Sequence, residues 1–125
     1  MKLLRWLILV CLCLIVGVPH LIAGEIERIQ AQGEIVVSLN KGYPPFAMMN
    51  GNQPHGLDVD LARLLADYLG VKVRFVTPER YDQQIPRLLA GESDIIIAAM
   101  TRTVERGLRV SFTDPYFEVS QAALV

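Results

Sequence analysis

The feature that most constrains the fold is an apolar run from Ile95 to Met100, which stops abruptly at Thr101 and Arg102. Its length and its β-branched residues are typical of a strand that is buried on both faces of a sheet. Such a strand delivers the polar residues that follow it to its carboxyl end. In an open α/β sheet, ligands bind in the crevice outside the carboxyl ends of the strands.

The residues that follow this strand include groups suited to an anionic ligand. Thr101 and Thr103 carry hydroxyls, free backbone N–H groups lie at the strand exit, and Arg106 carries a forked cation that matches a carboxylate. The alternative interpretation is a solvated turn in which the threonines cap a short helix from Val104 to Leu108. The spacing alone leaves both interpretations open.

The N-terminus has the pattern of a secretory signal peptide. Lys2 and Arg5 precede a stretch from Trp6 to Val18 that is uncharged and nearly all apolar. A poor cleavage site near Ala23 leaves an uncleaved membrane anchor as the alternative. We therefore expect residues 1–23 to be a signal peptide or anchor and residues 24–125 to form one exported, periplasmic or extracytoplasmic domain.

The cysteines and the charge exclude several kinds of site. Cys11 and Cys13 both lie in the apolar N-terminal segment, so the exported part has no cysteine for a disulfide, a zinc site or a nucleophile. No spacing of His, Asp and Glu resembles a metal site, and we expect neither a metal nor a cofactor. Without residues 1–23 the chain is mildly acidic, which does not favour a nucleic-acid partner.

Strands and helices alternate along the exported part. This alternation predicts an α/β fold with a mainly parallel sheet and helices on both of its faces. The expected helices span residues 25–32, 56–69, 81–90 and 104–108, and the expected strands span 34–40, 71–76 and 95–100. Residues 112–116 are expected to form a short strand and a proline turn, and a hairpin turn lies within 48–54.

Two helices have apolar residues at helical spacing, which predicts the faces that they bury. The residues expected to point inward are Leu61, Leu64, Leu65 and Tyr68 in helix 56–69 and Ile85, Leu88 and Leu89 in helix 81–90. Asp58 and Asp60 lie at the start of the first of these helices. Acidic residues are favoured at helix starts, so we interpret both as capping residues.

A stiff loop follows strand 34–40, which ends in the polar residue Asn40. The consecutive prolines Pro44 and Pro45 exclude regular structure and hold their neighbours Tyr43 and Phe46 on an extended loop. The two aromatic rings are interpreted either as an aromatic wall for a ligand or as hydrophobic plugs over the end of the sheet.

Four segments in order resemble the successive signatures of the family 3 extracellular solute-binding proteins, the periplasmic receptors for polar amino acids that feed ABC importers. The segments are Gly56–Leu61 (GLDVDL), Leu89–Asp94 (LAGESD), Met100–Arg106 (MTRTVER) and Phe112–Tyr116 (FTDPY). The order and spacing match from about Glu34 to Val125. Four motifs in register are much more specific than any one of them.

The resemblance implies a two-lobed clamp that closes on an amino acid, of which this chain carries the first lobe and lacks the second. It implies that Arg106 holds the ligand α-carboxylate and that Thr101 and the backbone around Ala99 share the carboxylate or the α-amino group. It further implies that Tyr43 and Phe46 cover the ligand and that Asn40 faces its side chain or its ammonium group.

The function implied by the resemblance is binding of a polar amino acid or a similar small carboxylate in the periplasm, without catalysis, for import through the membrane subunits of an ABC transporter. Contact with the membrane is expected only through the N-terminal segment. Two alternatives remain open at this point. One is a regulatory or sensory module of a membrane-bound lytic transglycosylase or a sensor kinase, and the other is a fragment of a cyclohexadienyl-dehydratase-like enzyme.

Overall fold

A computed structural model of the chain describes residues 24–119. The predicted signal peptide or anchor, both cysteines and the apolar end of the chain lie outside the described residues. Within residues 24–119, no helix is both long enough and apolar enough to cross a membrane.

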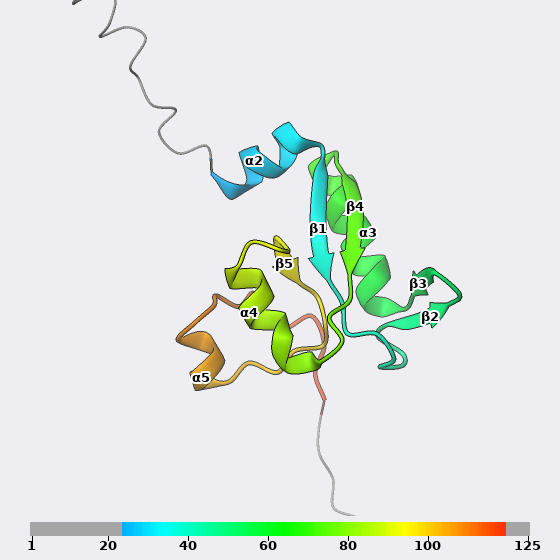
Figure 1. Ribbon diagram of the computed structural model, residues 1–125, viewed down its shortest axis with the longest axis vertical. Coiled ribbons are helices and arrows are strands. Elements are labelled where there is room, and N and C mark those ends of the chain that lie inside the picture. Colours follow the sequence, from blue (N-terminus) through cyan, green and yellow to red (C-terminus); the bar gives the residue numbers. More distant parts are fainter. Residues whose placement is uncertain (1–23, 120–125) are drawn as a thin grey trace, which may run out of the picture.

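A three-stranded parallel sheet organises the described residues. It consists of β1 (Glu34–Ser38), β4 (Lys72–Val76) and β5 (Ile95–Ile96), with β1 in the middle. Glu34 pairs with Lys72 at one end of β1, and Ser38 pairs with both Val76 and Ile96 at the other. The strands therefore end at the same edge of the sheet, the lower edge in Figure 1. The predicted α/β fold with a parallel sheet is confirmed.

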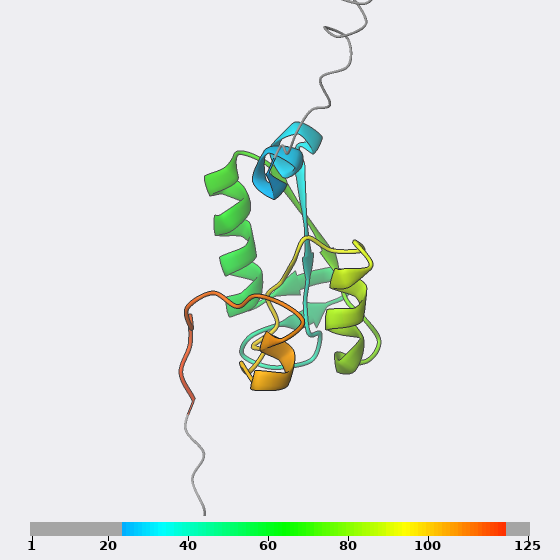
Figure 2. The ribbon, with the colours of Figure 1, turned by 90° about the vertical axis from the view of Figure 1, so that its left-hand side faces the viewer.

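Helices cover the two faces of the sheet (Figure 2). α3 (Leu57–Leu69) packs on β1 and β4, and α4 (Gln84–Leu89) lies on the opposite side, against β5. α2 (Glu25–Gln32) lies at the amino ends of the strands, as Figure 1 shows. The helix is followed by Gly33, which adopts the left-handed conformation with φ +70°. Its bounds are those predicted from the sequence, residues 25–32.

Smaller elements complete the structure at the carboxyl ends of the strands. β2 (Met48–Asn50) and β3 (Gln53–His55) form the predicted hairpin. The short 3₁₀ helix η1 (Tyr81–Gln83) leads into α4, and α5 (Val104–Gly107) follows β5. Figure 1 shows the hairpin and α5 on opposite sides of this end of the molecule.

The hydrophobic core lies on one face of β1, where the alternate residues Ile35, Val37 and Leu39 are all at most 3% exposed. A buried polar contact joins β1 to α4. Ser38 donates to Gln84 Oε1, and Gln84 Nε2 donates to the Leu39 carbonyl at 2.9 Å. The Gln84 side chain is 1% exposed, so these bonds satisfy polar groups that water does not reach.

The buried face of α3 differs from the predicted one. Leu64 and Tyr68 are 66% and 88% exposed, so their predicted inward orientation is wrong, whereas Leu61 and Leu65 are partly buried. The residues in the core are Val59, Ala62 and Ala66. Their small side chains allow the helix to approach the sheet closely. The sequence pattern of the larger apolar residues therefore pointed to a neighbouring face.

Helix 81–90 and the strand before Met100 are shorter than predicted. The helical region divides into η1 and α4, and Leu89 is 57% exposed rather than inward. The strand is limited to β5, after which Ile97 and Ala98 remain buried but Ala99 turns the chain away with φ +46°. This positive φ is incompatible with a continuing strand.

Two other strand predictions need correction. β1 ends at Ser38, so Asn40 lies beyond it on the loop. Residues 112–116 do not form a strand. Pro115 lacks the N–H that a sheet ladder requires, and the segment runs instead towards the start of α3, where Tyr116 bonds to Asp58.

Asp94 fixes the position of β5 against β1 at the amino end of the sheet. Its backbone N–H donates to the Val36 carbonyl at 2.8 Å, and its Oδ2 accepts the Val36 N–H at 2.7 Å. Its Oδ1 pairs with Arg28 of α2. One side chain, 8% exposed, therefore ties α2, β1 and the start of β5 together.

Candidate ligand-binding site

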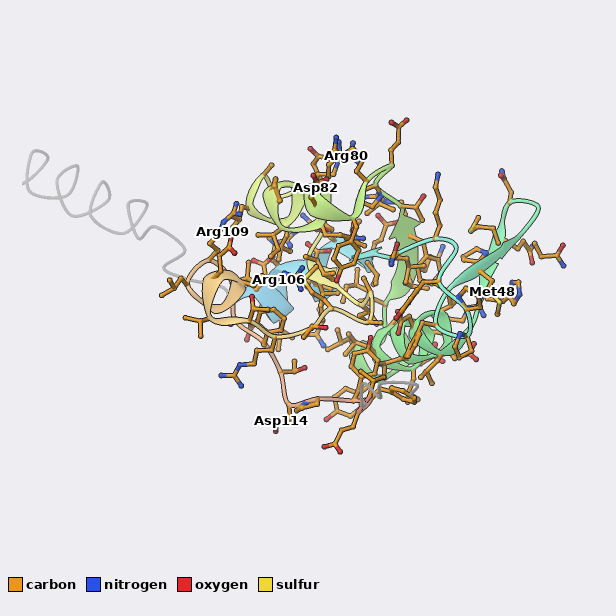
Figure 3. The ribbon with its side chains drawn as sticks, turned by 90° about the horizontal axis from the view of Figure 1, so that it is seen from below. Met48, Arg80, Asp82, Arg106, Arg109 and Asp114 are labelled. Atoms are coloured by element: carbon orange, nitrogen blue, oxygen red, sulfur yellow. The ribbon has the colours of Figure 1, made fainter. Side chains whose placement is uncertain are left out.

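The carboxyl edge of the sheet carries the predicted site residues. Figure 3 looks onto this edge, with Arg106 near its middle and Met48 on the hairpin at one side. Because β1, β4 and β5 are parallel, their carboxyl ends meet here and the loops that follow them lie together. The fold therefore brings residues from three separate parts of the sequence to one edge.

Arg106 is held in place by its own helix and by the loop that precedes it. Its backbone N–H donates to Thr103 Oγ1 at 3.3 Å, which caps the N-terminus of α5. Its Nη1 donates to the Thr101 carbonyl at 2.8 Å. Within the part of the chain that the structure describes, the half-buried guanidinium forms no ion pair with a carboxylate.

The two threonines have different positions. Thr103 is the helix cap, so the capping interpretation is correct for this residue and α5 ends at Gly107 rather than Leu108. Thr101 is exposed, and its carbonyl rather than its hydroxyl contacts Arg106. The Thr101 hydroxyl is thus left on the surface beside the guanidinium.

The two aromatic rings of the loop differ in exposure. Tyr43 is 49% exposed, whereas Phe46 is 7% exposed. The two rings are stacked with their centroids 5.4 Å apart, and Phe117 contacts Phe46 edge-on at 5.0 Å. Phe46 is therefore a hydrophobic plug with little free surface for a ligand, and it supports the exposed ring of Tyr43.

Asn40 lies at the same edge, directly after β1. The preceding residue, Leu39, donates its N–H to the Val76 carbonyl at 2.9 Å, which continues the contact with β4. Asn40 itself is half-buried. This position presents an amide, which both donates and accepts hydrogen bonds, beside the loop of Tyr43.

The backbone N–H of Ala99 has a partner within the chain. It donates to the Tyr116 hydroxyl at 2.9 Å, and that hydroxyl donates in turn to Asp58 Oδ1 at 2.8 Å. A donor expected to serve a ligand is therefore occupied by a side chain from the segment that follows α5.

Asp58 is a buried residue rather than a helix cap, which corrects the sequence interpretation. Its side chain makes no capping bond, because Gly56 is the N-cap and the Asp58 N–H donates to the Phe46 carbonyl at 2.9 Å. The residue is 0% exposed, and its Oδ2 has no hydrogen-bond partner within residues 24–119. Burial raises the pKa of Asp58, and the Tyr116 hydroxyl bond partly opposes this rise.

Tyr81 is the other site residue that sequence analysis missed. The Arg106 guanidinium lies 5.6 Å from the centre of its ring. Burial raises the pKa of the half-buried Tyr81, and the nearby Arg106 cation partly opposes this rise. In the sequence, Tyr81 is only the first residue of an expected helix. Its proximity to a residue of α5 depends on how the loops meet at the sheet edge.

No group of three or more His, Cys, Asp or Glu residues in the described part of the chain is arranged to hold a metal ion. The chemistry available at the sheet edge is thus that of a guanidinium cation, an exposed tyrosine ring, an amide and hydroxyls. This set is suited to binding a small molecule that carries a carboxylate.

A parallel α/β lobe with these groups at its carboxyl edge is the architecture of a solute-binding protein, and the family comparison agrees. The chain belongs to the bacterial extracellular solute-binding proteins, family 3, whose family model matches residues 35–125.

Two curated relatives are named for amino acids. The chain is 35% identical over 95 residues to ABC transporter arginine-binding protein 1 of Escherichia coli (strain K12). The matched residues cover 75% of this chain and 39% of that protein. It is 33% identical over 90 residues to a probable histidine-binding protein of Neisseria gonorrhoeae. Here the matched residues cover 71% of this chain and 33% of that protein. The chain thus spans little more than a third of the length of these relatives.

A solved structure of a single domain is also similar. The arginine-bound form of domain 1 of TmArgBP, from T. maritima, is 42% identical with a TM-score of 0.69, and the match covers 72% of this chain and 71% of that chain.

Proposed function

We propose that this chain forms the first lobe of an extracytoplasmic receptor for a basic amino acid, and that the receptor delivers its ligand to an ABC importer. The observation that carries the proposal is Arg106, a half-buried cation at the sheet edge that forms no ion pair with a carboxylate among the described residues. A planar guanidinium binds a carboxylate through two parallel hydrogen bonds, which lysine does not reproduce.

The neighbouring groups have distinct roles in this proposal. The exposed ring of Tyr43 covers the apolar part of the ligand, and the ligand ammonium is bound by the Thr101 hydroxyl. The Asn40 amide faces the ligand side chain. The Ala99 N–H joins the carboxylate only after the Tyr116 hydroxyl has moved, because one donor does not serve two full hydrogen bonds at once.

The relatives support the choice of ligand. Two are named for arginine and for histidine, and both are basic amino acids. The similar structure of domain 1 of TmArgBP was obtained in its arginine-bound form, which favours ligand binding by one lobe of the receptor. We expect a lone lobe to bind more weakly than a closed pair of lobes, because it leaves part of the ligand in water.

Binding without catalysis is part of the same proposal. His55, the one histidine among residues 24–119, is exposed on β3 of the hairpin. It is therefore available to solvent rather than aligned with a nucleophile in a closed site. Dehydration of a cyclic substrate would need an acid or base beside the bound carboxylate, and Asp58, the buried acid near this edge, is bonded to Tyr116.

The test is titration of the purified chain with L-arginine and L-histidine by calorimetry and by NMR, beside Arg106→Ala. We expect the substitution to weaken binding about tenfold to a hundredfold, since a charge-assisted hydrogen bond contributes about 1.5–3 kcal/mol. Arg109→Ala is the matched control, because Arg109 is an exposed arginine three residues further along that lies apart from Arg106 in Figure 3. Equal binding by the Arg106→Ala variant and the original chain would contradict the proposal, as would no binding by a folded chain.

A further inference from the structure

The turn of the β2–β3 hairpin contains the dipeptide Asn50-Gly51, on the side of the molecule opposite α5 (Figure 1). Asn50 is the last residue of β2 and is exposed to water. It is the one asparagine in the sequence that precedes a glycine, because Asn40 is followed by a lysine and Asn52 by a glutamine. The hairpin therefore holds one asparagine with an unhindered neighbour and, two positions further along, one without.

The backbone nitrogen of Gly51 is free to attack the side-chain amide of Asn50. Gly51 has φ +59°, and a Cβ at this position would meet nothing within 4 Å, so no other part of the lobe crowds the turn. Among residues 24–119 its N–H makes no hydrogen bond. Glycine adopts more backbone conformations than any other residue, so its nitrogen can reach Asn50 Cγ when the end of this short hairpin opens.

We propose that Asn50 is a site of spontaneous deamidation, and that Arg63 on α3 receives the carboxylate that this reaction creates. The Gly51 nitrogen loses its proton and forms a bond to Asn50 Cγ, while the side-chain nitrogen leaves as ammonia. Water then opens the five-membered imide at one of its two carbonyl carbons, which gives aspartate or isoaspartate. The net change is the loss of one ammonia and the gain of one water, without an oxidant or a reductant.

A polar hollow between the hairpin and α3 is suited to hold the new carboxylate. Its volume is about 220 Å³. The residues that line it are Asn50, Gln53, Pro54, His55 and Arg63. Asn50 is the strand partner of Gln53, so both side chains point to the same face of the hairpin.

Arg63 is only weakly engaged by its present partners. Its Nη1 lies 3.4 Å from Asp60 Oδ1, and its Nη2 lies 3.3 Å from the Pro54 carbonyl oxygen. Both distances are longer than the typical N–H···O separation of about 2.9–3.0 Å. A carboxylate at position 50 would offer this guanidinium a charged acceptor, and the resulting ion pair would join the hairpin to α3.

Mass spectrometry of the purified chain tests the first step. After incubation in mildly alkaline buffer, we expect the mass gain of amide-to-carboxyl conversion at Asn50 well before it occurs at Asn40 or Asn52, which serve as internal standards. Gly51→Asp adds a side chain beside the attacking nitrogen, and aspartate is among the few residues that adopt a positive φ readily. This variant should lower the rate at Asn50 to that at Asn52. Equal rates at the three asparagines of the folded original chain would overturn the proposal.

The second step is tested with the product made directly. Asn50→Asp should slow hydrogen exchange of the hairpin amides about 1.5-fold to fivefold, as expected for an exposed ion pair. The slowing should disappear at high salt and in an Arg63→Ala background. Asn52→Asp is the matched control, because it adds the same charge to the same turn at a residue that does not line the hollow.

Two results of the exchange measurement would overturn the assignment of Arg63. One is equal exchange in Asn50→Asp and the original chain, and the other is equal slowing by Asn52→Asp. Neither experiment contains an amino-acid ligand or alters Arg106, so both outcomes are independent of the proposed function.

Discussion

The Tyr116 hydroxyl donates a 2.8 Å hydrogen bond to Oδ1 of Asp58, a residue that is 0% exposed at the start of α3. The same hydroxyl accepts the N–H of Ala99, the residue at which the chain turns away after β5. One phenol therefore links the first turn of a helix, the end of the central sheet and the segment that follows α5. The contact lies at the edge where we place the ligand.

Removal of this hydroxyl should destabilise the lobe. Tyr116→Phe leaves Asp58 Oδ1 and the Ala99 N–H without their shared partner, and a buried polar group that loses its hydrogen bond costs about 1–3 kcal/mol. Chemical denaturation should show a fall of this size in the free energy of unfolding. Tyr68→Phe removes a hydroxyl from a side chain that is 88% exposed, and it should leave stability within about 0.5 kcal/mol of the original. Equal stability of the two variants would contradict the prediction.

Asp58 should make stability depend on pH. Burial raises the pKa of Asp58 in the folded chain above its ordinary value of 3.8, so the folded state binds this proton more tightly than the unfolded state. The resulting stabilisation is complete below the pKa that Asp58 has in the unfolded chain. It is lost as the pH rises through the higher pKa that Asp58 has in the folded chain. The original chain should therefore lose stability relative to Asp58→Asn as the pH rises from about 3.8 towards neutrality, through the raised pKa of Asp58 in the folded chain. Urea unfolding of both proteins across this range measures the difference, and parallel pH profiles would show that Asp58 does not contribute.

Asp94 should contribute more to stability than its ionic partner Arg28. Asp94→Ala removes the hydrogen bond to the Val36 N–H and leaves Arg28 without this partner, and loss of a charge-assisted bond costs about 1.5–3 kcal/mol. Arg28→Ala leaves the Val36 bond in place and removes a side chain that is 38% exposed, so its effect should be smaller than that of Asp94→Ala. Denaturation midpoints of the two variants give the ranking. A larger loss in Arg28→Ala would reverse the assigned roles.

Gly56 should not tolerate a side chain. A Cβ at this position would lie 2.4 Å from the Phe46 carbonyl oxygen, and the backbone has φ +127°. Gly56→Ala should cost more than the roughly 1–3 kcal/mol of backbone strain alone, since the Phe46 loop must also shift. Gly51→Ala is the comparison, because Gly51 has φ +59° but nothing within 4 Å of its Cβ position, and its cost should be about 1–2 kcal/mol. Thermal unfolding of the two variants tests the difference, and similar melting temperatures would exclude a tight contact at Gly56.

The regular elements were predictable because their signals are local. The helix from Glu25 to Gln32 ends at Gly33, which alone among residue types adopts a positive φ at little cost, and Asn50 and Gly51 mark the hairpin turn. The alternation of strands and helices predicted the parallel sheet and hence the edge where polar side chains gather. The location of Arg106 at that edge followed from the sequence.

The sequence by itself determined the order of the elements, the parallel sheet and the side of it on which Arg106 lies, because hydrophobic period and turn residues act over a few positions. Only the tertiary structure decided that Asp58 is buried against Tyr116, that Phe46 supports Tyr43, and that Tyr81 contacts Arg106. These pairs depend on how loops from different strands pack together. An acidic residue has the same local pattern whether it caps a helix in water or bonds to a tyrosine in the interior, and only long-range packing distinguishes the two.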